Sequence, residues 1–240
     1  MLQKHTIVFL KKAELQKRSF DEIARETFDL MSVFRTIDVD WRPNYITGRS
    51  KKNIKEFNWD YHSFAEELKK GVNKEGQRIL EELGYTISFF SSMDETKSFS
   101  YRLTVGVRHD AFYNNVTIGI PLSVNLFDVE IAAKIREMFE NISTNFCPHY
   151  GCVSNSRLSR NYGKLIDQGT PTTIHWINYW SNDIVSKIGT HRIKRALHKN
   201  MITSYPLMGG SIIQIKETAI DVDNSLDLKL HRDMEMKLLC

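Results

Sequence analysis

The densest group of potentially reactive side chains is the segment Cys147-Pro148-His149-Tyr150-Gly151-Cys152, which places two thiols and one imidazole within six residues. Thiolates and imidazoles are ligands of zinc, but a closed structural site takes four of them, usually from two such clusters. The sequence has no second cluster, and the third cysteine, Cys240, has no histidine beside it. We therefore predict structural, reduced cysteines and no bound metal.

Other motifs that carry chemistry are missing or incomplete. The eight histidines include no His-x-x-x-His pair, and the chain has no Gly-x-Ser-x-Gly, phosphate-loop or dinucleotide-binding glycine pattern. Asp221-x-Asp223-x-Ser225 is similar to the start of a calcium loop, but Leu226 replaces its glycine and Arg232 its closing glutamate. We predict a protein that is not an enzyme and needs no cofactor. A catalytic site assembled from distant residues is the alternative, and it would show as a deep pocket of ionisable groups with shifted pKa values.

The formal net charge is +4, from 33 basic and 29 acidic residues, and it is spread unevenly. Glu217, Asp221, Asp223 and Asp227 make the C-terminal region acidic. Basic clusters can neutralise nucleic-acid phosphates, although most are solvated surfaces. Direct nucleic-acid binding is therefore our second functional hypothesis. Two segments would carry it: Arg42, Arg49, Lys51, Lys52 and Lys55 in the first, and His191, Arg192, Lys194, Arg195, His198 and Lys199 in the second.

Composition and length indicate a globular chain. Of the 240 residues, 41% are hydrophobic and 26% charged, which is typical of folded domains. No apolar run approaches the ~20 residues that span a bilayer. The N-terminal residues lack the long apolar core and cleavage site of a secretory signal. We expect a cytoplasmic protein without a membrane partner.

The first half of the chain reads as helices followed by strands. We expect a strand over 6–10, then a helix that Ser19 caps and that buries Phe28, Met31 and Phe34. Residues 38–60 read as a long surface loop. Two shorter helices should follow, one around Phe64 and one over 73–83. Alternating residues then predict three strands, over 85–90, 99–107 and 115–120, joined as an antiparallel meander.

The second half repeats the mixture of helices and strands. Asp128 should open a helix, a short strand is expected near 151–154, and 156–172 reads as loop. Helices should follow over 181–188 and 190–199, then a strand over 212–215 and a last helix from Ser225. The pattern predicts an α+β fold, an antiparallel sheet of several strands packed with helices. We expect one intertwined domain over 1–240, with 146–169 as the alternative boundary.

Several short motifs are similar to the immunity protein 52 family of bacterial polymorphic-toxin and type VI secretion systems. The chain shows Trp176-Ile177-Asn178-Tyr179, a helix ending at Gly189, the Gly209-Gly210 entry into a strand, and the acidic turn 221–224 before the last helix. In the N-terminal half, Trp41, 57–59, 83–85, 105–107 and 114–116 also fit. The resemblance runs from about Phe20 to Leu238.

The resemblance implies an antitoxin-like inhibitor that binds and neutralises a cognate toxin, which is predicted to be a nuclease effector, and so protects its own cell during bacterial competition. It carries over no catalytic residue. Trp176, Asn178, Tyr179, Gly189, Gly209 and Gly210 are then family-signature positions, which we interpret as structural.

Inhibitors of nucleases are often acidic, because opposite charge speeds their association with a basic cleft. We therefore assign toxin contact to Glu217, Asp221, Asp223 and Asp227. Two alternatives stay open, namely that the inhibitor binds away from the catalytic cleft or that the toxin is not a nuclease.

Overall fold

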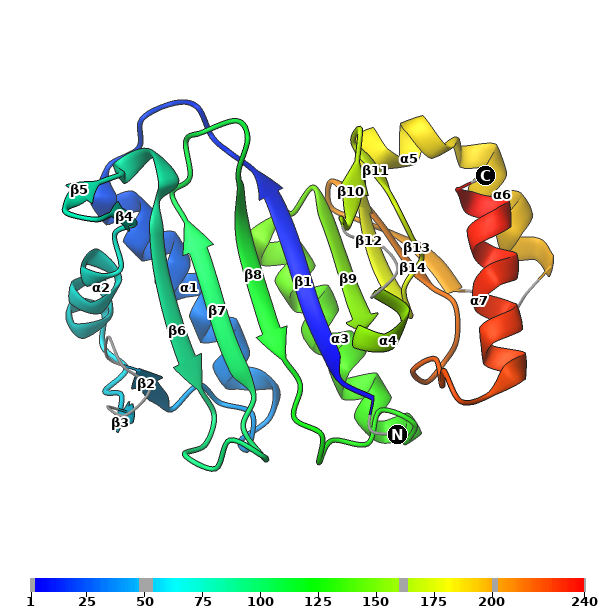
Figure 1. The fold of residues 1–240 in the computed structure, drawn as a ribbon, viewed down its shortest axis with the longest axis horizontal. Coiled ribbons are helices and arrows are strands. Elements are labelled where there is room, and N and C mark those ends of the chain that lie inside the picture. The colour runs from blue at the N-terminus through cyan, green and yellow to red at the C-terminus, as the bar shows by residue number, and fades with distance from the viewer. Residues whose placement is uncertain (1–2, 48–53, 160–163, 200–202, 240) are drawn as a thin grey trace. The chain divides into compact units, whose positions relative to one another are not determined.

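A computed structural model describes residues 3–47, 54–159, 164–199 and 203–239 (Figure 1). The chain divides into two compact units. The amino-terminal unit is Leu10–Pro121, and the carboxyl-terminal unit combines Met1–Phe9 with Leu122–Cys240. The segment 146–169 lies within the carboxyl-terminal unit. That the whole chain folds as one domain stays a prediction.

The amino-terminal unit contains an antiparallel sheet with strand order β8-β7-β6-β2-β3. The predicted meander is confirmed as β6, β7 and β8. The elements are α1 (Phe20–Ile37), β2 (Tyr45–Thr47), β3 (Ile54–Glu56), α2 (Tyr61–Lys70), β4 (Lys74–Glu75), β5 (Arg78–Ile79), a 3₁₀ turn (Glu81–Leu83), β6 (Tyr85–Phe90), β7 (Ser100–Val105) and β8 (Tyr113–Gly119).

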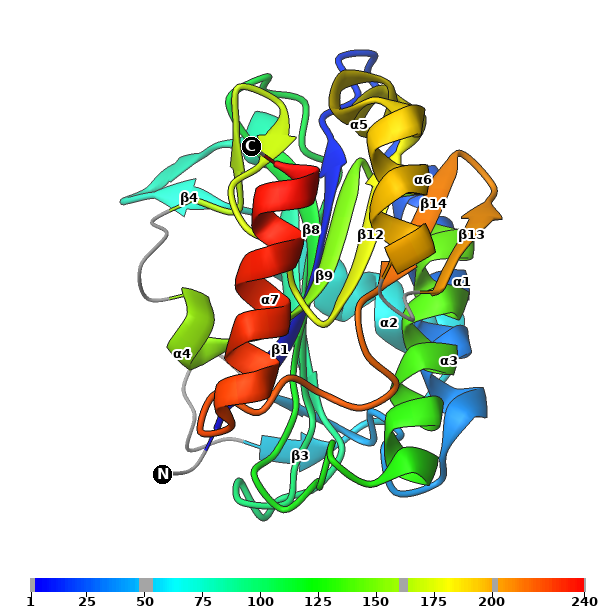
Figure 2. The same cartoon turned by 90° about the vertical axis from the view of Figure 1, so that its right-hand side faces the viewer.

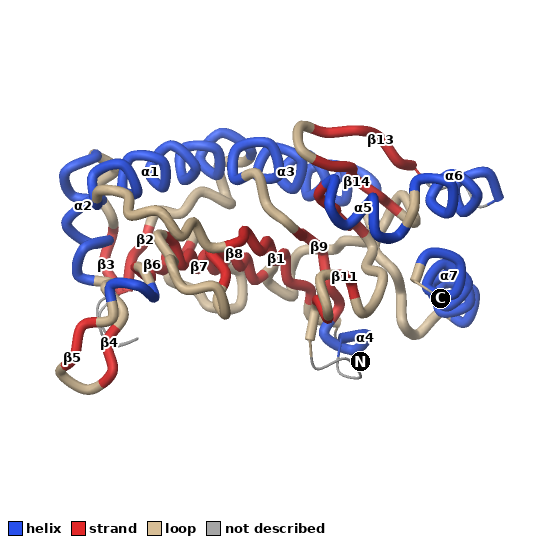
Figure 3. Tube along the Cα trace, turned by 90° about the horizontal axis from the view of Figure 1, so that it is seen from above, coloured by secondary structure: helices blue, strands red, loops and turns tan. Residues whose placement is uncertain are grey.

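The core of this unit lies on one face of the sheet. Phe89, Tyr101 and Ile118 are neighbours across three strands and are all buried. α1 lies along this face, as Figure 3 shows, and its Phe34 ring is 5.1 Å from that of Tyr101. Alternation along a strand places every second side chain on the same face. The expected pattern of strand and helix therefore produces a two-layer α+β unit.

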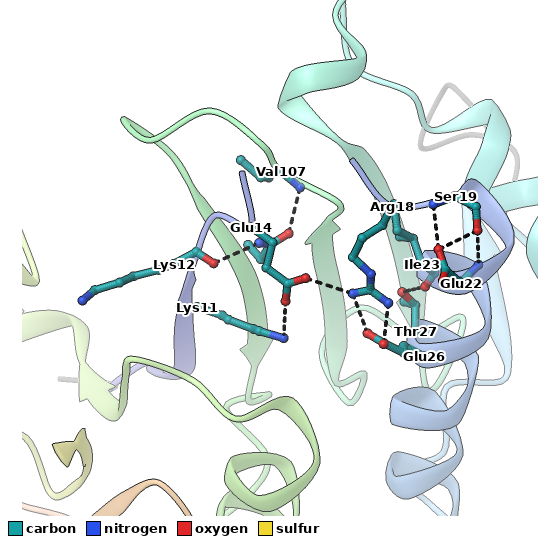
Figure 4. A network of polar contacts seen from close by, with 11 residues as sticks. Lys11, Lys12, Glu14, Arg18, Ser19, Glu22, Ile23, Glu26, Thr27 and Val107 are labelled. Carbon is teal, nitrogen blue, oxygen red and sulfur yellow. Dashed lines mark hydrogen bonds and ion pairs between the residues drawn. The ribbon is translucent and has the colours of Figure 1, made fainter. Parts of the chain in front are cut away.

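Polar contacts determine where α1 begins. The Ser19 hydroxyl accepts from the Glu22 N–H at 3.3 Å, and the Glu22 carboxylate accepts from the Ser19 N–H at 2.8 Å, which is a complete capping box. Just before the helix, the Arg18 guanidinium donates to both Glu14 and Glu26 (Figure 4). Capping by Ser19 is confirmed, and the ion-paired arginine ties the approach to α1 to its second turn.

The predicted helix over 73–83 is wrong, because the chain instead forms the β4–β5 hairpin and a 3₁₀ turn. Gly76 has a φ of 59° at the tip of this hairpin, which a helix does not allow. The Asn73 side chain donates to the Leu83 carbonyl at 2.6 Å and closes the segment into a loop. The predicted loop over 38–60 likewise contains the short strands β2 and β3.

The carboxyl-terminal unit is built on a sheet with the order β13-β14-β12-β9-β1, in which the pairs from β13 to β9 are antiparallel. Its elements are β1 (His5–Lys12), which ends in the other unit, α3 (Val129–Phe146), β9 (Tyr150–Asn155), α4 (Ser156–Ser159), β10 (Ile166–Asp167), β11 (Thr170–Pro171), β12 (Ile177–Ser181), α5 (Asn182–Ile188), α6 (Thr190–Lys199), β13 (Thr203–Leu207), β14 (Gly210–Gln214) and α7 (Ser225–Leu238).

Helices lie on both sides of this second sheet. In Figures 2 and 3, α3 and α7 lie on opposite sides of β9 and β12, and every residue of β9 is buried. Gly151 in β9 leaves room for Phe9, whose ring lies 4.6 Å from that of Phe139 on α3. Within the described residues, no helix combines the length and apolar character needed to cross a bilayer. The α+β class is confirmed.

Candidate partner-binding surface

The four acidic residues assigned to toxin contact lie in and beside the turn between β14 and α7. They differ in exposure. Glu217 is exposed and the Asp223 side chain is half exposed, whereas Asp221 is partly covered and Asp227 is buried. Only two of the four therefore present a carboxylate to a partner.

Asp227 has a structural environment. Its carboxylate forms an ion pair with the Lys216 ammonium at 2.6 Å and accepts the Asp221 N–H at 2.8 Å. Breaking a buried, hydrogen-bonded ion pair leaves an uncompensated charge, which costs several kcal/mol. Asp227 thus fixes the turn onto the first residues of α7 and holds its neighbours in place.

Asp221 and Asp223 join this turn to the start of the chain. The Gln3 side chain donates to Asp221 at 2.6 Å, and Asp221 also accepts the Asp223 N–H at 2.9 Å. The Arg157 guanidinium donates to Asp223 at 2.7 Å, and this hydrogen bond lowers the pKa of Asp223. Three predicted residues are thus brought together, with Arg157 and Lys216 offsetting their charge. Sequence reasoning did not find Gln3, which lies more than 200 positions away.

The aromatic signature residues Trp176 and Tyr179 are buried, in β12 and in the segment just before it. The Trp176 indole donates to the Lys216 carbonyl at 2.9 Å, and the Tyr179 hydroxyl donates to the Met208 carbonyl at 3.1 Å. Asn178 is fully buried, accepts the His175 N–H at 3.0 Å, and donates to the carbonyls of His175 at 2.8 Å and Ile213 at 3.3 Å. These contacts explain the signature by packing and hydrogen bonding.

The signature glycines meet backbone requirements. Gly189 ends α5 with a φ of 94°, and Gly209 has a φ of 76° in the β13–β14 turn. A Cβ on Gly210 would lie 2.2 Å from the Trp180 carbonyl oxygen, so only glycine allows β14 to approach β12. Gly189 therefore allows the chain to leave α5, and Gly209 and Gly210 allow the tight β13–β14 turn beside β12.

The basic surface proposed for nucleic acid is partly described. Arg192, Lys194 and Arg195 are exposed on α6, while Ile193 and Ala196 bury its opposite stripe. α6 contains no acidic residue. Arg49, Lys51 and Lys52, and the side chains of His198 and Lys199, lie outside the described part of the chain.

The two cysteines of the 147–152 cluster lie in different environments, because Cys147 follows α3 and Cys152 is in β9. Cys147 is exposed at the end of α3, whereas Cys152 is buried, and burial raises the pKa of its thiol to about 12. The Nδ1 atom of His149 lies 2.9 Å from the Ser181 hydroxyl, so this imidazole supports the start of α5. Among the described residues, no three His, Cys, Asp or Glu side chains are grouped as metal ligands. Cys240 is not among them.

Sequence reasoning missed a second surface, the outer face of the β6–β8 sheet. Figure 3 shows α1 on one side of these strands and, within the described residues of the unit, no α-helix on the other. Arg102 is exposed at its centre, and small polar side chains surround it on all three strands. These are Thr86, Ser88, Ser100, Thr104, Asn115 and Thr117. This face is therefore polar, with Arg102 exposed and its neighbours half-buried.

Comparison with known proteins gives a likeness of fold. No family model matches the chain, and no curated protein matches it in sequence. Among solved structures, a Pseudomonas aeruginosa protein described as "T6SS protein PA0821" is similar, with a TM-score of 0.65 and 11% identity. The likeness covers 98% of this chain and 72% of that chain. At this identity it shows a shared fold.

Proposed function

We propose that this chain is an immunity protein that binds and neutralises a cognate effector of a type VI or related secretion system. The observation that carries the proposal is the likeness of fold over 98% of the chain to a protein described as belonging to that system. The resemblance of the motifs around Trp176 and Gly210 to the immunity protein 52 family supports the same proposal, although these residues themselves have a structural role in β12 and β14.

The proposed mechanism is stoichiometric binding through a preformed surface. A stable protein–protein interface buries about 800 Å² on each partner. Glu217 is exposed beside the turn, and Asp223 is half exposed and held by Arg157 in a turn that Asp227 and Gln3 tie down, so the Asp223 carboxylate is positioned before binding. Ordered charges speed association with a partner of opposite sign and lower the entropic cost of docking.

The test is co-expression with the effector encoded beside this gene. Wild-type protein should restore growth and co-purify with the effector at a fixed ratio. Glu217→Lys should weaken binding at least tenfold, because it reverses an exposed charge in the acidic turn. Glu95→Lys, an exposed charge reversal in the other unit, is the control and should bind normally. Failure of the wild-type protein to restore growth would refute the proposal.

A second candidate is nucleic-acid binding, which the exposed basic side chains of α6 favour. Binding of this kind depends steeply on salt because phosphate contacts release counterions. A mobility-shift assay with duplex DNA and RNA at 50 mM salt tests it. The double variant Arg192→Glu with Arg195→Glu should abolish any mobility shift of the nucleic acid. If the wild-type protein gives no mobility shift, this candidate function is excluded.

A further inference from the structure

The amino-terminal unit contains a second candidate binding site, a pocket of about 500 Å³ between α2, β2, β3 and β6. Its wall combines apolar side chains, one carboxylate and two ammonium groups. The lining residues that matter here are Ile46, Lys55, Glu67, Lys70, Ile87 and Ser88.

Within the described residues, the pocket opens beside a part of β6 that no strand ladder covers on this edge. β2 pairs with β6 at Tyr45–Phe90 and Ile46–Phe89, and its ladder ends there. On the other side of Ser88, two residues earlier in β6, the Thr86 N–H donates to the Gly71 carbonyl at 2.8 Å. Backbone groups of alternate residues in an antiparallel strand point to the same edge. The N–H and C=O of Ser88 therefore face the pocket, between two segments that already pair with β6.

The charges in the pocket favour an anion. The Lys55 and Lys70 ammonium groups lie 3.1 Å from the same oxygen of Glu67, so two positive charges share one negative charge. Burial opposes ionisation of Glu67, but hydrogen bonds from both lysines outweigh it and lower its pKa. Both lysine side chains are about three-fifths exposed, at 61% and 62%, and can turn toward an incoming ligand. The surplus positive charge argues against a cation.

We propose that this pocket binds the carboxylate of an extended peptide segment. Lys55 and Lys70 hold the carboxylate, and the adjacent amide of the peptide pairs with the backbone of Ser88. Charge-assisted hydrogen bonds supply the affinity, while pairing with a strand edge orients the peptide. Ile46 and Ile87 supply the apolar wall beside it. A chain end and an acidic side chain both carry this chemistry.

The probes are three short peptides titrated into the full-length ¹⁵N-labelled protein. Acetyl-Ala-Ala-Ala with a free carboxylate tests a chain end, acetyl-Ala-Glu-Ala-amide tests an acidic side chain, and acetyl-Ala-Ala-Ala-amide has neither. Saturable shifts of the Thr86–Ser88 amides are expected with one or both of the first two peptides. Equal shifts with the third peptide, or no saturable shift with any, would overturn the proposal.

Three variants test the assignment of the charged groups. Lys55→Gln with Lys70→Gln should weaken binding at least tenfold, whereas Lys97→Gln removes a lysine that is 73% exposed and should have no effect. Glu67→Gln should strengthen binding a few-fold at low salt, because the ligand no longer competes with this carboxylate. Weaker binding by Glu67→Gln, or unchanged binding by the double variant, would overturn the assignment. The result is independent of whether the protein is an immunity protein.

Discussion

Asn178→Ala provides the strongest test of the structural role of the signature. This buried side chain satisfies the His175 N–H and two carbonyls, at 3.0, 2.8 and 3.3 Å. Alanine would leave these backbone groups without their partner inside the sheet. Each buried group that loses its partner costs about 1–3 kcal/mol, and the longest of the three bonds counts least. We expect a loss of about 3–4 kcal/mol in the free energy of unfolding.

Urea denaturation followed by tryptophan fluorescence measures this loss. Trp176 and Trp180 are buried close to Asn178 in sequence and should report on the carboxyl-terminal unit. With an m-value of about 2–3 kcal/mol/M, the midpoint should fall by at least about 1 M urea.

Asn145→Ala is the matched control, because Asn145 is exposed on α3 and makes one local hydrogen bond, to Asn141. It should change stability by no more than about 0.5 kcal/mol. A loss below about 1 kcal/mol for Asn178→Ala would show that its hydrogen bonds do not hold β12 in place.

Four further predictions concern stability. Burial, reinforced by the charge of His231, lowers the pKa of His175 to about 3. As pH falls below about 6.5, this histidine is therefore protonated in the unfolded state but not in the folded state, which destabilises the fold by about 2 kcal/mol between pH 7 and 5. His175→Phe should remove this loss, as measured by urea melts at the two pH values. Ser19→Ala removes the capping hydroxyl and should cost about 1 kcal/mol by the same measurement. Gly210→Ala should lower the melting temperature strongly because its Cβ meets the β12 backbone, with a loss of about 2–4 kcal/mol. Asp227→Ala should lower the free energy of unfolding by about 3 kcal/mol, as measured by calorimetry. An Asp227→Ala variant that stays as stable as the wild type and loses only partner binding would contradict the structural role of Asp227.

Local patterns determined much of the fold. Ser19, Asp128 and Gly189 mark helix ends because caps and left-handed residues depend on neighbours a few positions away. The alternation over 99–107 identified β7 because one face of its sheet is buried and the other is open. The family-signature residues could be interpreted as structural for the same reason, since aromatic and glycine types are typical of packing and tight turns.

Other features depended on contacts between residues far apart in the sequence. The segment 73–83 has helical spacing, but Gly76 and the Asn73–Leu83 hydrogen bond make it a hairpin and a turn. β12 is buried on both faces, so it lacks the alternation that would have identified it as a strand.

The acidic turn shows the same division between sequence and tertiary structure. The sequence by itself determined that Glu217, Asp221, Asp223 and Asp227 are close along the chain. Only the tertiary structure decided that Lys216 neutralises one of them and that Arg157 and Gln3 restrain two others. The reason is physical, because burial and pairing of a charge depend on which distant segments fold against it.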